Sequence, residues 1–317
     1  MASTTKFFLV AFAICVICVA PQRAVAGQLP PSYLVVDSQT GYVLIEQNAR
    51  EKRQIASLTK MATACVVLDW AEKKGGDLNQ LATISQAAFV GVEKNEVGWQ
   101  VGDVVSLRDL LYAALVQSDN LAANALALRV GETLQSAESN SKITPATGFV
   151  AQMNALAKQL GMDRTRFVNP SGFDYKERPM PYSTAIDLAR LTRYAMNKAS
   201  FRFYVSQKER EISFNRAGKQ MRTLLRTTND LLGTNGIDGV KTGQTARAGE
   251  CLILSANRAA EVIKNGDNAT IFPRHLIVVI LGSNDRFGDG ERLVRQGWQL
   301  YDQWAAAGRL VDPKKML

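Results

Sequence analysis

Apolar positions near the start of the chain form two short β-rich runs and then change to a helical spacing. The runs YLVVD (Tyr33–Asp37) and GYVLIE (Gly41–Glu46) are separated by three polar residues, which predicts a hairpin. A helix is predicted to begin near Ser57, because apolar residues then recur every three or four positions. The residues of this apolar face are Leu58, Met61, Cys65 and Leu68.

The same reading predicts a helical middle and strands near the C-terminal end. Helices are expected at Leu107–Gln117, Asn120–Arg129, Phe149–Leu160, Thr184–Met196 and Glu291–Ala307. A polar loop is expected at Gln135–Thr147, and strands at Ile237–Thr242, Cys251–Ala256 and Leu276–Leu281. The simplest assembly is an α/β (α+β) fold. It has one antiparallel sheet built from both chain ends, flanked by helices, with an all-helical subdomain inserted at roughly residues 75–175.

Residues 1–26 have the pattern of a secretory signal peptide. Lys6 precedes an apolar run of 14 residues, Phe7–Ala20, and Ala24-Val25-Ala26 offers small residues at a cleavage site. A transmembrane anchor is the less favoured reading, because it needs roughly 18 or more apolar residues. We therefore expect cleavage after Ala26, a secreted or periplasmic protein, a domain at residues 27–307 and a short tail at 308–317.

Composition and charge narrow the class of protein. With 46% hydrophobic and 21% charged residues, the chain is globular in type. Removal of the signal peptide lowers the net charge from +9 to +7, because that segment carries Lys6, Arg23 and no acidic residue. This surplus suits an anionic envelope polymer or membrane surface. Nucleic acid is not indicated, because no basic run interleaves with aromatic residues.

Histidine and cysteine are scarce. The only histidine, His275, argues against a His-rich metal site, and its simplest reading is a sheet-edge residue. Two cysteines, Cys65 and Cys251, lie beyond the signal peptide, both in apolar runs. They are compatible with a disulfide in an exported protein or with buried free thiols.

One Ser-x-x-Lys motif stands at the start of a predicted helix. Ser57 and Lys60 are three residues apart, so the hydroxyl and the amine can meet on one helix face. Burial and the helix N-terminus both lower a lysine pKa, which suits a base near neutral pH. The motif alone is weak, because Ser3–Lys6 and Ser139–Lys142 match it too. A plain helix start is the alternative.

Two further motifs follow in order. Ser118 and Asn120 form a Ser-x-Asn between two helices, where a helix cap is the alternative reading. Lys241, Thr242 and Gly243 form the only Lys-Thr-Gly, in a strand-like context. There the glycine would permit close approach of an extended peptide, and a hairpin turn is the alternative.

The three motifs together, in this order, are those of penicillin-binding proteins and class A β-lactamases. The chain resembles the serine D-Ala-D-Ala carboxypeptidases, the low-molecular-mass penicillin-binding proteins, from about Tyr33 to Trp304. The resemblance implies a β-lactamase/transpeptidase-like fold. It rests on these stretches: ASLTKMAT (Ala56–Thr63), FVNPSGFD (Phe167–Asp174), YSTAIDLARLTRYAM (Tyr182–Met196), GIDGVKTGQTARAGECLILSA (Gly236–Ala256) and LIVVILGS (Leu276–Ser283).

The resemblance implies a role for each motif residue. Ser57 matches the acylated nucleophile, Lys60 its base and Ser118 the hydroxyl that relays the proton. The residues implied to bind substrate are Asn120, Lys241, Thr242, Gly243, Gln244 and Arg286. The backbone N–H groups of Gln244 and Ser57 would form an oxyanion hole. Arg286 is the candidate for a carboxylate-binding arginine, and Arg274 is the weaker candidate.

The implied activity is removal of the terminal D-Ala from peptidoglycan stem peptides through an acyl-enzyme, with β-lactams as covalent inhibitors. No metal or organic cofactor is implied. Two departures stand out. Asp119 occupies a position where the carboxypeptidases commonly have Gly, and Phe167–Asp174 lacks the Glu-x-x-x-Asn of class A β-lactamases.

The short tail leads us to expect no tight membrane anchor, and it favours the alternative of an endopeptidase that cuts crosslinks. The remaining alternative is a non-catalytic penicillin or peptidoglycan sensor.

Overall fold

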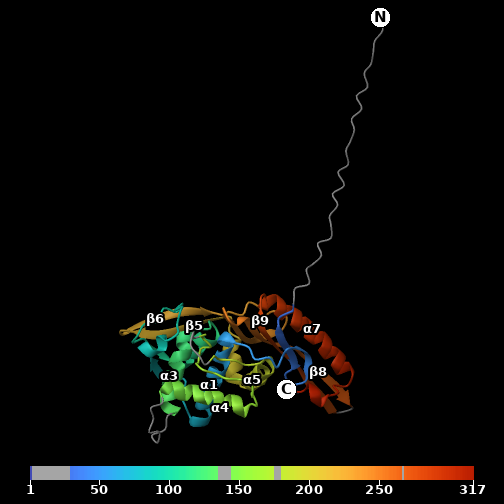
Figure 1. Cartoon of the computed structure of the whole chain (residues 1–317), viewed down its shortest axis with the longest axis horizontal. Helices are drawn as coiled ribbons and strands as arrows, with labels where there is room; N and C mark the ends of the chain where they lie inside the picture. Colours follow the sequence, from blue (N-terminus) through green and yellow to red (C-terminus); the bar gives the residue numbers. More distant parts are fainter. Residues whose placement is uncertain (2–28, 135–143, 175–179, 266–267) are drawn as a thin grey trace.

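The computed structural model describes residues 1, 29–134, 144–174, 180–265 and 268–317 (Figure 1). Residues 2–26 of the expected signal peptide lie outside the described residues, as do the Ser-x-x-Lys matches at Ser3 and Ser139. Most of the loop expected at Gln135–Thr147 also lies outside them. Its last residues are helical, because α4 begins at Pro145 after Thr144, whose side chain accepts a hydrogen bond from the Thr147 N–H.

Strands from both ends of the chain form one antiparallel sheet, in the order β2-β1-β9-β8-β7 (Figure 1). The N-terminal hairpin joins the C-terminal strands through β1 and β9, where Val35 pairs with Val278. The predicted sheet of terminal strands flanked by helices is thus confirmed. Its strands are β1 (Ser32–Asp37), β2 (Val43–Gln47), β7 (Ile237–Thr245), β8 (Gly249–Asn265) and β9 (Asn268–Ser283).

Helix α7 (Arg286–Ala306) covers one face of this sheet (Figure 1). Trp298 and Tyr301 are buried in a cluster that includes Val35 from the sheet. Gly297 allows close packing, because a Cβ there would lie 2.7 Å from Val35 Cγ1. The helix therefore packs closely against the sheet at a glycine that directly precedes its buried aromatic residues.

Helix α7 begins five residues before the predicted start at Glu291. The side chain of Asp285 caps its first turn by accepting a hydrogen bond from the Gly288 N–H at 3.0 Å. Two glycines in this turn lower its helical propensity, so the sequence pattern did not reveal it.

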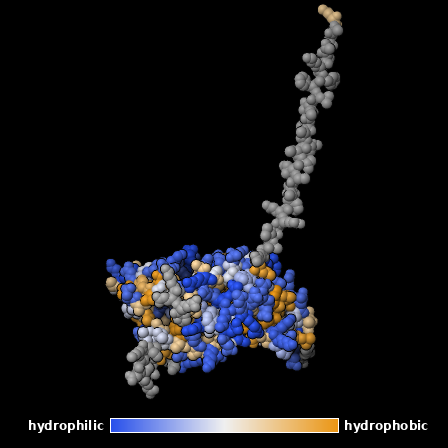
Figure 2. Space-filling model, in the orientation of Figure 1, coloured by the Kyte–Doolittle hydropathy of each residue, from blue (hydrophilic) through white to orange (hydrophobic). Residues whose placement is uncertain are grey.

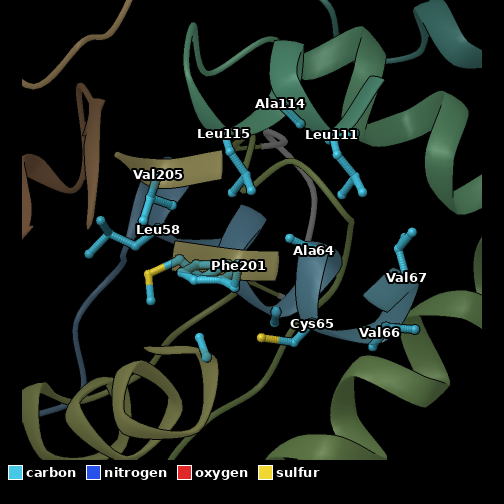
Figure 3. Close-up of a cluster of buried hydrophobic side chains, with 14 of the residues drawn as sticks. Leu58, Ala64, Cys65, Val66, Val67, Leu111, Ala114, Leu115, Phe201 and Val205 are labelled. Atoms are coloured by element: carbon cyan, nitrogen blue, oxygen red, sulfur yellow. The ribbon is translucent and has the colours of Figure 1, made fainter. Parts of the chain in front are cut away.

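Helices cover the opposite face. Helices α5 (Ala185–Met196) and α6 (Ala199–Val205) pack against the sheet, and α1 (Lys60–Lys74) contacts both of them. Figure 3 shows apolar side chains from η1, α1, α2 and α6 meeting in one cluster; those labelled include Leu58, Cys65, Leu111, Leu115, Phe201 and Val205. This core fixes the start of α1, where the Ser-x-x-Lys motif lies.

The other helices confirm the predicted positions with small changes at their ends. They are α2 (Leu107–Leu115), α3 (Asn120–Leu134) and α4 (Pro145–Gln159). The structure also has short 3-10 turns, of which η2 and η3 were not predicted: η1 (Ala56–Thr59), η2 (Gln86–Phe89) and η3 (Pro313–Lys315). Helices α3 and α4 lie side by side, and α3 also contacts α1 and α2.

A second antiparallel sheet, with the order β3-β4-β5-β6, was not predicted. Two of its strands have only three residues each, and the other two carry many charged residues, so neither pair shows a clear apolar alternation. Two of these strands fall inside the stretch that we expected to be entirely helical. The strands are β3 (Leu81–Thr83), β4 (Val104–Ser106), β5 (Glu209–Arg216) and β6 (Lys219–Arg226).

The cysteines Cys65 and Cys251 are both buried and both free. Burial raises the pKa of the Cys251 thiol to about 11 and raises that of Cys65 further, so both thiols stay protonated at neutral pH. Of the two alternatives left open by the sequence, the structure has buried free thiols.

The visible surface is mostly hydrophilic, and hydrophobic residues gather towards its two ends (Figure 2). Exposed apolar side chains include Val262 and Ile271 on β8 and β9, and Leu310 after α7. Within the described parts of the chain, no helix has the length and apolar character to cross a bilayer.

Candidate active site

Ser57 lies in η1, immediately before α1. In a 3-10 turn the side chains at positions i and i+3 eclipse each other, and Ser57 Oγ lies 2.8 Å from Lys60 Nζ. The preceding residue, Ala56, has a φ of 46°, in the left-handed region that non-glycine residues seldom occupy. Such strain persists where the surrounding core enforces it, and Ala56 is fully packed.

Lys60 is fully buried and has three polar neighbours. Besides Ser57, its Nζ donates hydrogen bonds to Asn120 Oδ1 at 2.6 Å and to the Ser171 carbonyl at 2.7 Å. A neutral amine has two N–H groups and one lone pair. The two oxygen acceptors use the N–H groups, and the lone pair then faces the Ser57 hydroxyl, which suits removal of its proton.

Burial lowers the pKa of Lys60 to about 7, and the negative charge of Asp119 opposes this shift. Burial raises the pKa of Asp119 itself to about 6, while the Ala122 N–H, which donates to Asp119 Oδ1 at 2.6 Å, lowers it. A substantial fraction of Lys60 is therefore neutral at physiological pH without any histidine.

Ser118 lies in the turn between α2 and α3, and Asn120 is the first residue of α3. Ser118 has a φ of 64°, again in the left-handed region. It lines the same pocket as Ser57. Because Asn120 Oδ1 accepts from Lys60, its Nδ2 group remains to donate to a bound ligand.

Lys241 is buried beneath the strand that carries it, and its Nζ donates to the Thr242 carbonyl at 3.1 Å. Burial holds its pKa well below the usual value, and the positive charges of Lys60 and Arg286 act in the same direction. A ligand carboxylate would relieve this clustering of cations. The Thr242 hydroxyl lies 2.5 Å from that of Thr228.

Gly243 brings β7 against the nucleophile. A Cβ at Gly243 would lie 3.1 Å from the backbone N of Ser57 and 3.0 Å from the Ile55 carbonyl oxygen. Strand β7 is the edge strand of its sheet, so its outer edge is open to an extended peptide. The backbone N–H groups of Ser57 and Gln244 are therefore candidates for an oxyanion hole.

The structure separates the two candidate arginines. Arg286 Nη1 donates to the Gly243 carbonyl at 3.3 Å, beside the Lys-Thr-Gly strand. Arg274 instead pairs with Asp302 at 2.6 Å and packs over Trp298 on the α7 side of the sheet. Arg286 therefore remains the candidate for binding a carboxylate, and Arg274 does not.

His275 forms no part of this site. Its Nε2 lies 2.5 Å from Ser255 Oγ and 3.7 Å from Asp238 Oδ1. Because the hydroxyl and the carboxylate approach the same ring nitrogen, the three cannot work as a Ser-His-Asp relay, which needs both nitrogens.

Four of the predicted residues, Ser57, Ser118, Asn120 and Gln244, line one pocket of about 710 Å³. Lys60 is not in its lining but is hydrogen-bonded to Ser57 and Asn120, which are. Its walls come from regions far apart in sequence: η1, the stretch around Lys94, residues 117–120, the segment ending at Asp174, and the end of β7 with the turn after it. Sequence reasoning missed three contributors, namely the Ser171 carbonyl, the Thr228 hydroxyl and Asp174, which accepts a hydrogen bond from Thr245. A backbone carbonyl has no residue signature, and Thr228 belongs to no motif. Asp174 ends the family-like stretch Phe167–Asp174, but that resemblance was not used to assign it a role in the site.

Comparison with known proteins agrees with this geometry. A sequence model of the D-alanyl-D-alanine carboxypeptidase family matches residues 22–264. The chain belongs to this family. The matched region includes all three motifs, from Ser57 through Lys241 to Gly243.

Curated relatives in the family have carboxypeptidase and endopeptidase names. D-alanyl-D-alanine carboxypeptidase DacC of Escherichia coli is 32% identical over 86% of this chain, and the match spans 62% of that relative's length. A D-alanyl-D-alanine endopeptidase of Pseudomonas aeruginosa is also 32% identical, over 83% of this chain and 76% of its own length.

Solved structures share the fold. The crystal structure of the Streptomyces K15 DD-transpeptidase matches with a TM-score of 0.71 and 27% identity, over 86% of this chain and 97% of that one. Penicillin-binding protein D2 of Listeria monocytogenes, in an ampicillin-bound form, matches with a TM-score of 0.65 and 29% identity, over 85% and 97% of the two chains. The expected transpeptidase-like fold is thereby confirmed.

Proposed function

We propose that this chain is a serine D-Ala-D-Ala carboxypeptidase that removes the terminal D-Ala from peptidoglycan stem peptides. The observation that carries the proposal is the buried Lys60, whose pKa is about 7 and whose Nζ lies 2.8 Å from Ser57 Oγ, beside an open strand edge. Family membership and the carboxypeptidase names of relatives support the same reading.

In the proposed reaction Lys60 takes the Ser57 proton, and Oγ attacks the carbonyl carbon between the two D-Ala residues. The N–H groups of Ser57 and Gln244 stabilise the resulting oxyanion. The C–N bond then breaks, and the departing amine takes a proton from Lys60 through the Ser118 hydroxyl. Water hydrolyses the ester and restores Ser57.

Substrate binding follows from the same pocket. The terminal carboxylate would lie near Thr242, Lys241 and Arg286, where cations cluster. The Asn120 amide would donate to the peptide backbone on the acyl side of the scissile bond. A β-lactam would acylate Ser57 in the same way, but its amine leaving group stays tethered and the ester persists.

The test is release of D-Ala from a model pentapeptide by the purified protein. We expect Ser57→Ala to lose both this release and covalent labelling by fluorescent penicillin. The matched control is Ser206→Ala, which removes an exposed hydroxyl after α6 and leaves both signals unchanged. D-Ala release by Ser57→Ala at the parental rate would refute the proposal.

An endopeptidase acting on crosslinks is the second candidate, and the observation in its favour is the 32% identity to the Pseudomonas aeruginosa endopeptidase. Both reactions use the same acyl-enzyme, so the site geometry alone does not separate them. Product analysis on whole peptidoglycan does: the carboxypeptidase shortens pentapeptides, whereas the endopeptidase converts crosslinked dimers to monomers.

We further propose that the protein works outside the cytoplasm after cleavage behind Ala26. The sequence of residues 1–26 and the peptidoglycan substrate support this location. N-terminal sequencing of the exported protein should begin at Gly27.

A further inference from the structure

One short segment connects the proposed base to the proposed oxyanion hole. At one end, the Ser171 carbonyl accepts a hydrogen bond from Lys60 Nζ at 2.7 Å. At the other end, Asp174 Oδ2 accepts a hydrogen bond from the Thr245 hydroxyl on β7. Thr245 directly follows Gln244, so the segment spans the pocket from Lys60 to the strand edge.

The segment is held firmly by its own contacts. Asn169 Oδ1 accepts hydrogen bonds from the N–H groups of Ser171 and Gly172, and its Nδ2 donates to the Phe173 carbonyl at 2.8 Å. Gly172 has a φ of 79°, and a Cβ there would lie 1.9 Å from the Ala56 carbonyl oxygen. The segment is therefore packed directly against the residue that precedes the nucleophile.

Strand β7 has less support at this point than the strands inside the sheet. As the edge strand it pairs with a single strand, β8, in the part of the chain that the structure describes. The Thr245 hydroxyl accepts from the Ala248 N–H at 3.0 Å and gives its own proton to Asp174. This hydroxyl thus joins the β7–β8 turn to the segment across the pocket.

Asp174 is well placed for such a contact. Its Oδ1 is buried and accepts no hydrogen bond from any part of the chain that the structure describes, so Thr245 is the partner that orients the carboxylate there. Both residues line the same pocket as Ser57.

We propose that Asp174 is a positioning residue for acyl transfer. Its hydrogen bond from Thr245 fixes the position of the neighbouring Gln244 N–H. The two N–H groups of the proposed oxyanion hole, on Gln244 and Ser57, therefore stay at the distance that acyl transfer requires. This inference rests on the proposed function. A displacement of about 1 Å in such a site can lower a rate about 100-fold.

The test is a double-mutant cycle on Asp174 and Thr245, measured by the acylation rate with fluorescent penicillin and by kcat and KM for D-Ala release. We expect Asp174→Ala and Thr245→Val each to lower the acylation rate and kcat by about 100-fold, with a smaller change in KM. Because both variants break the same bond, the double variant should be no slower than either single variant.

Conservative variants separate positioning from loss of fold. Asp174→Asn and Thr245→Ser can re-form the hydrogen bond and should keep most of the activity. The matched control is Thr40→Val, which removes a similar bond, from the Thr40 hydroxyl to Asp37 at 2.7 Å, in the turn after β1. It should lower the melting temperature at most and leave acylation unchanged.

The inference is overturned if Asp174→Ala acylates at the parental rate, or if the effects of the two single variants multiply in the double variant. If Asp174→Ala fails to fold, Thr245→Val and Thr245→Ser provide the test. Slow acylation in Thr245→Val alone supports the proposal, and parental acylation in Thr245→Val overturns it. If the parental protein neither binds penicillin nor releases D-Ala, the proposed function fails instead.

Discussion

At the residue scale, Lys60 can act as a base at physiological pH because a substantial fraction of it is neutral there, whereas a lysine in water is almost fully protonated. Burial lowers its pKa, and the two oxygen acceptors, on Asn120 and Ser171, hold the amine with its remaining position towards Ser57. Asp119 limits the shift through its negative charge. Asp119, the middle residue of the Ser-x-Asn motif, therefore raises the pKa of Lys60 through its charge and not through a contact with Ser57.

The first prediction concerns pH. Only neutral Lys60 can take a proton, so the acylation rate should rise with pH, with a midpoint near 7, and level off above it. Asp119→Asn removes a negative charge that raises the pKa of Lys60, so the midpoint should move to lower pH. Asparagine can still accept from the Ala122 N–H, which keeps the cap of α3.

Penicillin acylation measured from pH 5 to pH 9 checks this prediction. Glu93→Gln provides the control, because it removes a different negative charge that lines the pocket, whereas the charge that raises the pKa of Lys60 is that of Asp119. Its profile should overlay the parental profile. A midpoint that rises in Asp119→Asn would contradict the assigned electrostatic role.

Much of the candidate site could be predicted from sequence, because three motifs in a fixed order indicate the side chains that the proposed mechanism uses. Ser57 and Lys60 are in contact as expected, whereas the hydrogen bond from Lys60 to Asn120 was not predicted. Contacts that depend on the path of the chain could not be predicted. The acceptor on Ser171 is a backbone carbonyl, and the choice between two arginines depends on where α7 begins.

At the element scale, β7 must be both a sheet edge and a close neighbour of η1. Gly243 allows the close approach, because its missing Cβ leaves room for the backbone N of Ser57. Gly243→Val should push the edge away from the nucleophile and lower acylation by about 100-fold, the typical effect of losing an oxyanion-hole donor. The folded state should survive, because β8 still pairs with β7.

Labelling kinetics with fluorescent penicillin, beside a thermal melt, measure both effects. The control is Gly218→Asn in the turn after β5, where a Cβ meets open space and asparagine tolerates the φ of 83°. Parental acylation in Gly243→Val would show that the strand edge does not set the oxyanion hole.

The elements themselves were predictable where apolar residues alternate or recur over five residues or more. That covers β1, β2 and the apolar parts of β7 to β9, as well as the long helices. The apolar pattern does not reveal β3 and β4, which have three residues each, or β5 and β6, whose exposed faces are charged. These strands form because tertiary pairing overrides weak local preference.

At the scale of the whole molecule, the central sheet lies between two separate apolar layers. One faces α7, and the other faces the helices that carry the Ser-x-x-Lys and Ser-x-Asn motifs. Residues of the pocket come from the second layer and from the end of β7. Helix α7 therefore packs on the face of the sheet opposite the helices that line the candidate active site.

The final prediction tests that separation at Gly297, where α7 meets the sheet. Gly297→Leu places a side chain where a Cβ alone would lie 2.7 Å from Val35 and 3.1 Å from Leu276. Overpacking of this kind should cost about 3 kcal/mol of unfolding free energy. Gln299→Leu adds the same side chain on the exposed face of α7 and should change stability by less than about 0.5 kcal/mol. Denaturant unfolding gives both values, and penicillin acylation at low temperature should stay parental per folded molecule in both variants. If Gly297→Leu were stable but slow to acylate, the two layers would be coupled, and the sheet would transmit changes at α7 to the edge strand that carries Gly243.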